Sequence, residues 1–442
     1  MSRPTGVWFC LASALFLLAT QGCATSKPNS DFEQIANEVA TSIARTNIHQ
    51  NLETTKLFEM ETAVSIALDN NPSLASIRRG VAMAVEKYPQ VTAFDDPMLG
   101  VGFFPSTAGA NGGNFAYKID FKQRIFYPGK LRLKGEKAIA EATASLNDFG
   151  SAKVKLASLV KSAYLELFFA HRAIEVNEEN KKLLQEFKTI AEAQYSAGKG
   201  NLQDVIQADL DLAKAEHNDI MFERKLKVAT ARLNTLMGRK AQLPLPAPAR
   251  LPLMPPLPDK EILLKKALNK NPSIKAARFK IEAHNLSLKL AHAQSYPDFT
   301  FTGSYNRAWA KDELRPFVGV SINIPLLSSR LRAKKNIAKI KLNQANSDLT
   351  AKENDIRFEI ENAWQRLKEF HHSEKIFSEI IVPQTKLNLN AARAGYRNGG
   401  NDFLTLVTAE RSMVNTKLKY ERVLVNLRLM QAMLLEAVGT NK

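Results

Sequence analysis

Two hydrophobic periodicities divide the chain into short strand pairs and long helical stretches. Residues 299–309, 317–324 and 115–122 alternate apolar with polar side chains, which predicts β-strands with one apolar and one polar face. Residues 130–195 and 330–396 instead repeat apolar residues at helical spacing, with few glycines or prolines. At about 1.5 Å per residue, each of these stretches predicts a helix on the order of 100 Å long. Such helices are too long for a globular core and indicate a rod or tube.

The same helix-boundary phrase occurs twice, as ALDNNPSL at residues 67–74 and as ALNKNPSI at residues 267–274. A residue that precedes proline disfavours the helical conformation, so one helix is predicted to end before each Asn-Pro pair. Pro72 and Pro272 then each begin a second helix, in whose first turn a missing N–H costs nothing. The chain is therefore predicted to be a duplicated domain.

Each repeat is expected to hold the same parts in the same order. The second helix should end near Tyr88-Pro89 in one repeat and near Tyr296-Pro297 in the other, and a bend or break is expected near Pro383. The expected boundaries are a first repeat over 57–238 (β-hairpin 90–127, long helical hairpin 130–238), a stiff proline-rich linker over 239–261, and a second repeat over 262–442 (β-hairpin 297–327, long helical hairpin 330–438).

Two related turns reverse the long helices, AQYSAGKGNLQDVIQAD at residues 193–209 and AGYRNGGNDFLTLVTAE at residues 394–410. Glycine just past a helix end supplies a left-handed cap, and Asn201 or Asp402 can cap the next helix. The turns also share residues that capping does not need. The matched pairs are Tyr195 with Tyr396, Gly198 with Gly399, and Val205 with Leu406.

The N-terminus has the pattern of an export signal. Arg3 precedes an apolar run that is too short to span a bilayer as a mature helix. We interpret residues 1–22 as a lipoprotein-type signal peptide, Cys23 as the lipidated residue and residues 23–56 as an N-terminal extension. Ordinary cleavage nearby, which leaves Cys23 incidental or removes it, is the alternative. Cys10 lies inside the signal, so no disulfide is expected.

The formal net charge of +17 suggests nucleic-acid binding, but an exported protein seldom meets nucleic acid. The basic residues are spread along helices, which fits solvated faces or attraction to acidic partners. The sequence contains no phosphate-binding loop, dinucleotide fingerprint or nucleophile elbow. His371 and His372 are adjacent and point in different directions on a helix, unlike a zinc pair. We expect no enzyme activity, no cofactor and no metal site.

The duplicated Asn-Pro-Ser openings and the paired Tyr-x-x-Gly turns resemble the TolC-like outer-membrane efflux protein family over essentially the whole mature chain. The resemblance implies a mainly α fold with a small β part. A homotrimer would form a 12-stranded outer-membrane β-barrel continued by a long periplasmic α-helical barrel. FYPGKLRLKGEKA at residues 126–138 resembles the branch that serves heavy-metal efflux pumps. The polar strand positions expected to face the barrel lumen are Lys118, Asp120, Lys122, Thr300, Thr302, Ser321 and Asn323.

The resemblance also implies functional positions at the two turns. The periplasmic tip that docks an adaptor protein is expected to consist of Tyr195, Gly198, Val205, Tyr396, Gly399 and Leu406. The next helix starts correspond to the entrance gate of the family, and the matching residues are Asp204, Gln207, Thr405 and Thr408. Because only Asp204 is acidic among these four, strong cation selectivity at the gate is not expected.

The implied function is the outer-membrane exit duct of a tripartite efflux system. Its partners would be a periplasmic adaptor, an inner-membrane transporter of the RND type and outer-membrane lipid, with a lipid anchor on the periplasmic side. A type I protein secretion duct is the alternative within the family. Outside the family, the alternatives are a lipid-anchored periplasmic coiled-coil adaptor or scaffold without a pore and, more weakly, a basic helical nucleic-acid binder.

Overall fold

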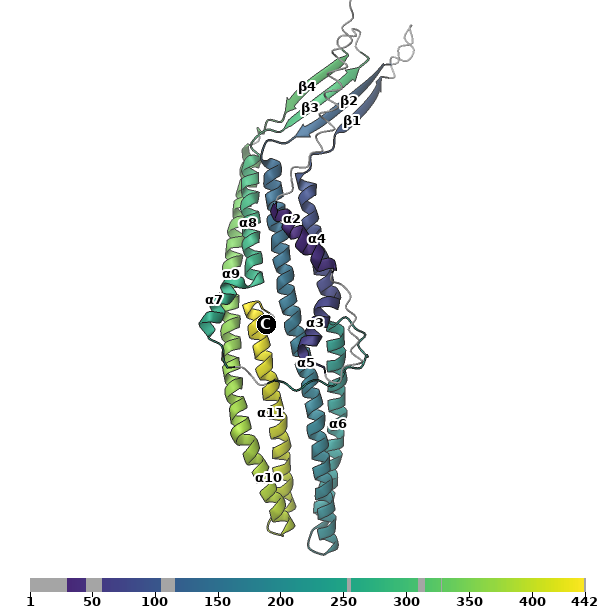
Figure 1. Ribbon diagram of the computed structural model, residues 1–442, viewed down its shortest axis with the longest axis vertical. Helices are drawn as coiled ribbons and strands as arrows, with labels where there is room; N and C mark the ends of the chain where they lie inside the picture. The colour runs from purple at the N-terminus through teal and green to yellow at the C-terminus, as the bar shows by residue number, and fades with distance from the viewer. Residues whose placement is uncertain are drawn as a thin grey trace, which may run out of the picture. The chain divides into compact units, whose positions relative to one another are not determined.

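Long helices and a four-stranded antiparallel sheet make up the part of the chain that the computed structural model describes (Figure 1). The described residues are 30–44, 58–104, 116–252, 256–308, 315–326 and 328–440. The chain divides into two units, each of which contains segments of both repeats. The first holds residues 1–43, 79–146 and 276–348, and the second holds residues 44–78, 147–275 and 349–442.

The first unit contains the sheet. The strands pair in the order β1-β2-β3-β4, and their bounds are Met98–Phe104, Ala116–Ile125, Phe299–Asn306 and Pro316–Ile322. The sheet therefore joins a hairpin from each repeat, which confirms the predicted strand pairs. The unit also holds α2 (Ser30–Ala44), most of α4 (Pro72–Thr92) and α8 (Pro272–Ala293), and the first turns of α5 (Lys130–Ser196) and α9 (Ser328–Ile376).

The second unit contains the helical hairpins. Its elements are α3 (Met60–Asn70), the rest of α5, α6 (Leu202–Leu236), α7 (Lys260–Lys270), the rest of α9, the π-helical segment η4 (Phe377–Ile381), α10 (Val382–Arg397) and α11 (Phe403–Val438). In this unit α5 pairs with α6, and α10 pairs with α11 (Figure 1). Three buried apolar clusters lie between these helices, so the core is a series of seams along the hairpins.

The Asn-Pro pairs form two equivalent joints between helices. The side-chain amide of Asn71 donates to the Leu236 carbonyl at 2.9 Å, and that of Asn271 donates to the Ala437 carbonyl at 2.8 Å. The Asn71 and Asn271 side-chain oxygens also accept backbone N–H bonds from the first turns of α4 and α8. Each buried asparagine therefore caps the helix that it begins and the last helix of its own repeat.

A π-helical turn accounts for a one-residue difference between the repeats. Buried residues of α5 and α9 match at a spacing of 200 positions, as Leu167 and Leu367 do, whereas the tyrosines of the turns, Tyr195 and Tyr396, are 201 positions apart. The segment η4, Phe377–Ile381, lies between these two matches. A π-turn is a one-residue insertion into an α-helix. The irregularity expected near Pro383 is this widened turn, which directly precedes α10.

The proline-rich linker is held in place in the second unit by one aromatic residue from each repeat. The Tyr164 hydroxyl donates to the Phe58 carbonyl at 2.6 Å and accepts the Ala249 N–H at 3.1 Å. The indole N–H of Trp364, which is 200 positions after Tyr164, donates to the Pro258 carbonyl at 3.1 Å. Equivalent positions of α5 and α9 therefore hold two points of the proline-rich linker in place.

Two predicted features differ from the structure or lie outside it. The helix expected to end near Tyr88-Pro89 continues to Thr92, where the Thr92 hydroxyl bonds the Tyr88 carbonyl at 2.8 Å; its counterpart α8 ends at Ala293. The signal peptide and Cys23 lie outside the described residues.

Among the described helices, none combines the length and the apolar character needed to cross a membrane.

Candidate functional sites: the hairpin turns and the two-faced sheet

The two hairpin turns have the same backbone design. Gly198 (φ 67°) and Gly399 (φ 73°) both adopt the left-handed conformation, which glycine reaches without a Cβ clash. The Gly198 N–H donates to the Tyr195 carbonyl at 3.0 Å, and the Gly399 N–H donates to the Tyr396 carbonyl at 3.2 Å. These bonds satisfy terminal carbonyls of α5 and α10. Capping therefore explains the shared glycines.

The helix starts after the turns differ in their caps. The Asp402 carboxylate accepts the Thr405 N–H at 2.8 Å, so the predicted cap of α11 is confirmed. Asn201 makes no side-chain cap bond to α6, so the equivalent prediction is wrong. The exposed Thr408 hydroxyl donates to the Leu404 carbonyl of its own helix at 2.7 Å.

One hydrogen-bond chain joins the two hairpins beside their turns. The Tyr396 hydroxyl donates to Asp204 Oδ2 at 3.4 Å, and the Gln194 side chain donates to the Tyr396 carbonyl at 3.1 Å. Burial, reinforced by the Asp204 charge, raises the pKa of Tyr396 to about 12. The phenol therefore stays a hydrogen-bond donor at physiological pH. These contacts connect α10 of the second hairpin with both α5 and α6 of the first.

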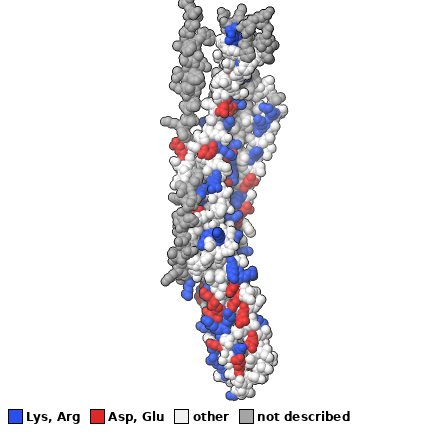
Figure 2. Space-filling view, turned by 90° about the vertical axis from the view of Figure 1, so that its right-hand side faces the viewer, with Lys and Arg blue, Asp and Glu red and all other residues white. Residues whose placement is uncertain are grey.

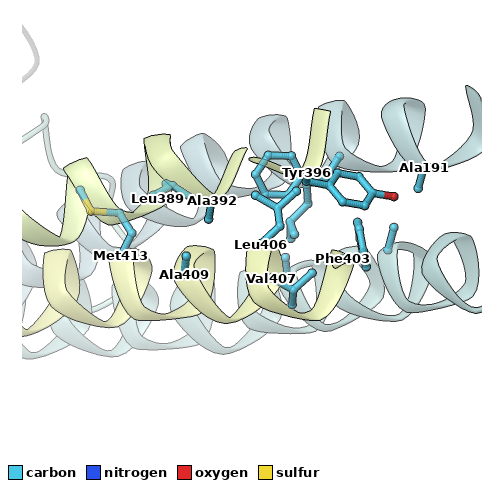
Figure 3. Packing of buried hydrophobic residues seen from close by; sticks show 13 residues of the cluster. Ala191, Leu389, Ala392, Tyr396, Phe403, Leu406, Val407, Ala409 and Met413 are labelled. Atoms are coloured by element: carbon cyan, nitrogen blue, oxygen red, sulfur yellow. The ribbon is translucent and has the colours of Figure 1, made fainter. Parts of the chain in front are cut away.

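An apolar cluster lies beside this chain of bonds. Tyr396 meets Phe403 edge-on, with ring centroids 5.3 Å apart (Figure 3). Both hairpins contribute to the buried set, which is Leu184, Phe187, Ala191, Ala208, Ala215, Leu389, Ala392, Tyr396, Phe403, Leu406, Val407, Ala409 and Met413. Because the cluster draws on four helices, separating the hairpins would expose apolar surface as well as break hydrogen bonds.

The residues expected at the docking tip fall into two groups. Tyr195 is 47% exposed, and a Cβ added at Gly198 or Gly399 would meet no other atom within 4 Å. By contrast, Tyr396 and Leu406 are 3% and 0% exposed, so their side chains belong to the core and not to the surface of the tip. Val205 is half-buried and packs against the same cluster.

The four predicted gate residues also separate. Asp204 and Gln207 of α6 are half-buried and hydrogen-bonded, to Tyr396 and to Asp211 respectively. Thr405 and Thr408 of α11 are exposed. The structure therefore ties the α6 pair into side-chain networks and leaves the α11 pair on the surface of the described chain.

A buried carboxylate that sequence reasoning missed lies next to Gln207. Asp211 is buried on α6 and accepts hydrogen bonds from Gln207 at 2.8 Å, Arg411 at 2.6 Å and Lys214 at 3.2 Å. Burial raises the pKa of Asp211, but these three bonds outweigh burial and the net shift is downward. Arg411 belongs to α11, so this ion pair is a second polar link between the hairpins.

Glu410, adjacent to Arg411, is a second buried acid that the sequence reasoning missed. Its side chain lies among core residues of α11 and is 2% exposed. Burial and the neighbouring Asp211 charge raise the pKa of Glu410 to about 7, against the opposing effects of Arg411 and a hydrogen bond with Asn180. Helical spacing gives the missing signal, because Val407 and Met413, three positions away on either side, are core residues.

The α5–α6 hairpin carries interleaved charges on its surface. Figure 2 shows acidic and basic side chains alternating over this part of the second unit. Lys188 of α5 pairs with Asp209 of α6 at 2.6 Å, and Lys181 pairs with Asp219. Much of the basic excess here is therefore matched by acids on the facing helix.

The sheet has one polar and one apolar face. Residues that pair across an antiparallel sheet point to the same side. The register pairs Lys122 with Thr302 and Thr300 with Ser321, so the named polar residues of β2, β3 and β4 share one face. That face includes Lys118, Asp120, Lys122, Thr300, Thr302 and Ser321. The opposite face carries apolar side chains such as Val101, Ile119, Phe301 and Val320, which are exposed.

Asn323, the last predicted lumen residue, lies beyond the end of β4 and belongs to a polar joint instead. Its side-chain oxygen accepts the Asp298 N–H. The buried Asp298 carboxylate accepts from Lys130 Nζ at 2.7 Å, from Arg124 at 2.9 Å and from the Tyr127 N–H at 3.0 Å. The Tyr127-Pro128-Gly129-Lys130 segment thus links the strands to the start of α5.

Both repeats are similar to one known protein family. The outer membrane efflux protein family model matches the chain twice, over residues 63–239 and 263–440. The chain belongs to the outer membrane efflux protein family. This efflux protein is 23% identical over 234 residues to the cobalt-zinc-cadmium resistance protein CzcC of Cupriavidus metallidurans, a match that covers 53% of the chain and 56% of CzcC.

Two further comparisons cover more of the molecule. The cation efflux system protein CusC of Escherichia coli strain K12 is 22% identical over 387 residues, 81% of each chain. A crystal structure of CusC superposes with a TM-score of 0.74 at 20% sequence identity, over 89% of this chain and 96% of CusC. The superposition confirms the TolC-like fold predicted from the sequence.

The efflux protein is accordingly a non-enzymatic outer-membrane channel that extends into the periplasm, and the family implies a trimer that acts in tripartite efflux. Its described residues contain no group of three or more His, Cys, Asp or Glu side chains placed to hold a metal ion.

Proposed function

We propose that three copies of this efflux protein form the exit duct for metal cations. A periplasmic adaptor would dock on the hairpin turns, and an inner-membrane transporter of the RND type would supply the energy. The similarity to CzcC, a cobalt-zinc-cadmium resistance protein, and to CusC, a cation efflux system protein, supports a metal substrate. The segment at residues 126–138, which resembles the metal-efflux branch in sequence, supports the same assignment.

The observation that carries the duct proposal is the link between the two hairpins at their turns. Tyr396 of α10 binds Asp204 across the hairpins, and Arg411 of α11 binds Asp211 farther along α6. An entrance formed by such hairpins opens only when they separate. The two links therefore act as a latch that stabilises the closed arrangement, with the mixed apolar cluster beside it.

The adaptor contact is assigned to the surface of the turns. The Tyr195 side chain is exposed, and the backbone at Gly198 and Gly399 has no side chain to cover it. The buried side chains of Leu406 and Tyr396 support the turns from the core. A glycine surface allows close approach of a partner backbone. Acylation of Cys23 would anchor the same subunit to the periplasmic leaflet.

The four strands are assigned to a barrel shared by the three copies. A four-stranded sheet leaves two open edges, and unpaired backbone groups in lipid are too costly to persist. Closure with two more copies would satisfy both edges. The apolar face with Val101 and Val320 would then meet lipid, and the face with Lys118 and Asp120 would line the lumen.

Planar-bilayer recording of the purified protein tests the duct and its latch together. Tyr396→Phe removes one hydrogen bond worth about 1 kcal/mol from each of the three copies, so the open fraction should rise at least about fivefold. Asp204→Asn should act in the same direction. Tyr195→Phe is the matched control at the equivalent position and should leave the conductance unchanged. A protein without any pore activity contradicts the duct, and equal behaviour of the two tyrosine variants contradicts the latch.

The substrate is tested separately in cells that lack the gene for this chain but keep its adaptor and transporter. Restoring the gene for this chain should restore growth in cobalt, zinc or cadmium salts. Restored resistance to organic toxicants alone would overturn the metal assignment while leaving the duct intact.

A further inference from the structure

Exposed apolar side chains mark the helical end of the sheet in the first unit. Ile324 and Leu326 follow β4 and are 63% and 82% exposed. Phe94 precedes β1 and Tyr296 precedes β3, and about half of each of these side chains is exposed. In outer-membrane proteins, aromatic residues collect where the membrane meets water. For a channel of the outer membrane, this level is therefore the periplasmic boundary of the bilayer.

Four cations follow this boundary directly in the sequence. They are Arg330, Arg332, Lys334 and Lys335, in the first turns of α9, and the next acidic residue along the helix is Asp348. At about 1.5 Å per residue these four span about 8 Å along the helix axis. That length is close to the thickness of one headgroup layer, because a bilayer of about 40–45 Å has a hydrocarbon core of about 30 Å.

These cations lack acidic partners within the described chain. Lys334 donates to the Gln294 side-chain oxygen at 3.3 Å, and no ion pair to a described residue involves Arg330, Arg332 or Lys335. Elsewhere, cations of the long helices pair with acids on the facing helix, as Arg411 does with Asp211. The start of α9 therefore presents positive charge that the fold itself does not neutralise.

The start of α5 in the first repeat also carries four cations, and there each cation has a partner. The start of α5 reads KLRLK where the start of α9 reads RLRAK, 200 positions later. In α5 each cation is engaged: Lys130 with Asp298 at 2.7 Å, Arg132 with Glu136 at 2.5 Å, Lys134 over the Phe126 ring at 4.1 Å and Lys137 with Glu141 at 3.6 Å. The second repeat carries Asn336 and Lys341 at the positions of Glu136 and Glu141. Three cation positions are shared by the repeats, while Lys335 and Lys137 correspond to Gly135 and Ile337. Both acids are absent from the second repeat.

We propose that the start of α9 binds the headgroups of anionic phospholipids in the periplasmic leaflet of the outer membrane. A guanidinium forms paired hydrogen bonds with phosphate oxygens, and the ammonium of Lys335 adds a point charge. The exposed Ile324 and Leu326 lie directly before the cations in sequence and contact the acyl chains of the same lipids. The surface thus orients each subunit in the leaflet independently of the substrate that the duct carries.

The test uses the full-length trimer in a neutral detergent, titrated with phosphatidylglycerol or with phosphatidylcholine. Phosphatidylglycerol should raise the melting temperature of the trimer, phosphatidylcholine should not, and added salt should weaken the effect. The triple variant Arg330→Gln, Arg332→Gln, Lys335→Gln should need at least tenfold more phosphatidylglycerol for the same rise. The α5 variant Arg132→Gln, Lys134→Gln, Lys137→Gln removes the same number of cations and should respond as the unchanged protein does.

Three results for the triple variant would overturn the proposal. The first is a response to phosphatidylglycerol like that of the unchanged protein. The second is dissociation of the trimer without any lipid, which would assign the cations to a contact between subunits. The third is an unchanged lipid response with altered ion selectivity of the pore, which would place the cations in the lumen. Should the triple variant fail to assemble in cells, the single variants Arg330→Gln and Arg332→Gln give the same comparison, each with a smaller loss of response.

Discussion

The two repeats agree where a segment contacts its own repeat and differ where the repeats contact each other. Asn71 and Asn271 make the same pair of helix caps, each with the final helix of its own repeat. At the turns, by contrast, Tyr396 is buried and bonded to Asp204, whereas its equivalent Tyr195 is exposed. The matched tyrosines therefore lie in different environments where the two repeats contact each other.

Packing gives the reason for this difference. Two copies of one surface that meet side by side cannot both fill the same space, because interiors are close-packed. At the turns Tyr396 fills the space between the hairpins, so the equivalent tyrosine faces outward. The joint at Asn71 involves no such meeting, and both copies keep it. Residues that both repeats bury in the same way serve folding. A residue that only one repeat buries leaves its counterpart exposed and available for a function.

The largest expected effect comes from deleting one residue of α5, compared with a deletion at the π-turn, which is the one insertion between the long helical stretches. Deleting Ser378 together with Pro383→Ala should convert η4 to α-helix without rotating α10 and α11 out of register, and the trimer should still assemble. Deleting the exposed Glu178 from the equivalent part of α5 should abolish assembly. A lost residue in a regular helix rotates all later side chains by about 100°, which takes Leu184 and Phe187 out of the core.

Size-exclusion chromatography and heat-resistant trimer bands distinguish the two deletions. Deleting Ser378 while Pro383 is kept is the intermediate control, because proline inside a regular helix costs about 3 kcal/mol. If the two single-residue deletions, at Glu178 and at Ser378 with Pro383→Ala, disrupt the trimer equally, then η4 is not a one-residue insertion.

A smaller and equal effect is expected at the Asn-Pro joints. Asn71→Ala and Asn271→Ala each remove a buried amide and leave a helix-end carbonyl without its partner. The loss should be about 2–4 kcal/mol in each case, from the missing bonds and the unsatisfied carbonyl. Denaturant unfolding at one fixed protein concentration measures it. A loss in one repeat only, with the other unaffected, would show that the joints are not equivalent.

Sequence alone predicts the parts of this molecule whose signals are local. The strand alternation, the helix starts at Pro72 and Pro272, and the glycine turns follow from period, backbone restriction and chirality, and the structure contains all three. The cap at Asp402 was predictable for the same reason.

The features that sequence could not supply depend on contacts between distant segments. Matching Tyr195 to Tyr396 predicted equal roles, because the pattern carries no information on which copy is buried. Asp211 and Glu410 appear as ordinary charges of exposed helices until the facing helix is in place. Asp298 likewise becomes the centre of a joint only when Arg124 and Lys130 meet it. Burial at such positions is a property of the packed pair of repeats.

The smallest expected effect uses the pH dependence of the buried acid on α11. The pKa of Glu410 is raised from 4.5 to about 7, so the folded protein holds a proton that the unfolded chain releases above pH 4.5. The stabilisation is full below pH 4.5 and is lost as pH rises through 7. Glu410→Gln should remove this dependence, worth about 2–3 kcal/mol between pH 5 and pH 8.

Asp209 is the matched control, because it stands at the position of Glu410 in the first repeat but is 52% exposed and paired with Lys188. Unfolding midpoints at pH 5, 6, 7 and 8 should show Glu410→Gln gaining stability relative to the unchanged protein as pH rises, while Asp209→Asn follows the unchanged curve. Because Asp211 shares the site, the midpoints report the pair of acids together. Parallel curves for Glu410→Gln and the unchanged protein would mean that Glu410 is solvated in the assembled trimer. Glu410 and Asp209 would then have similar environments, and the two repeats would not differ at this position.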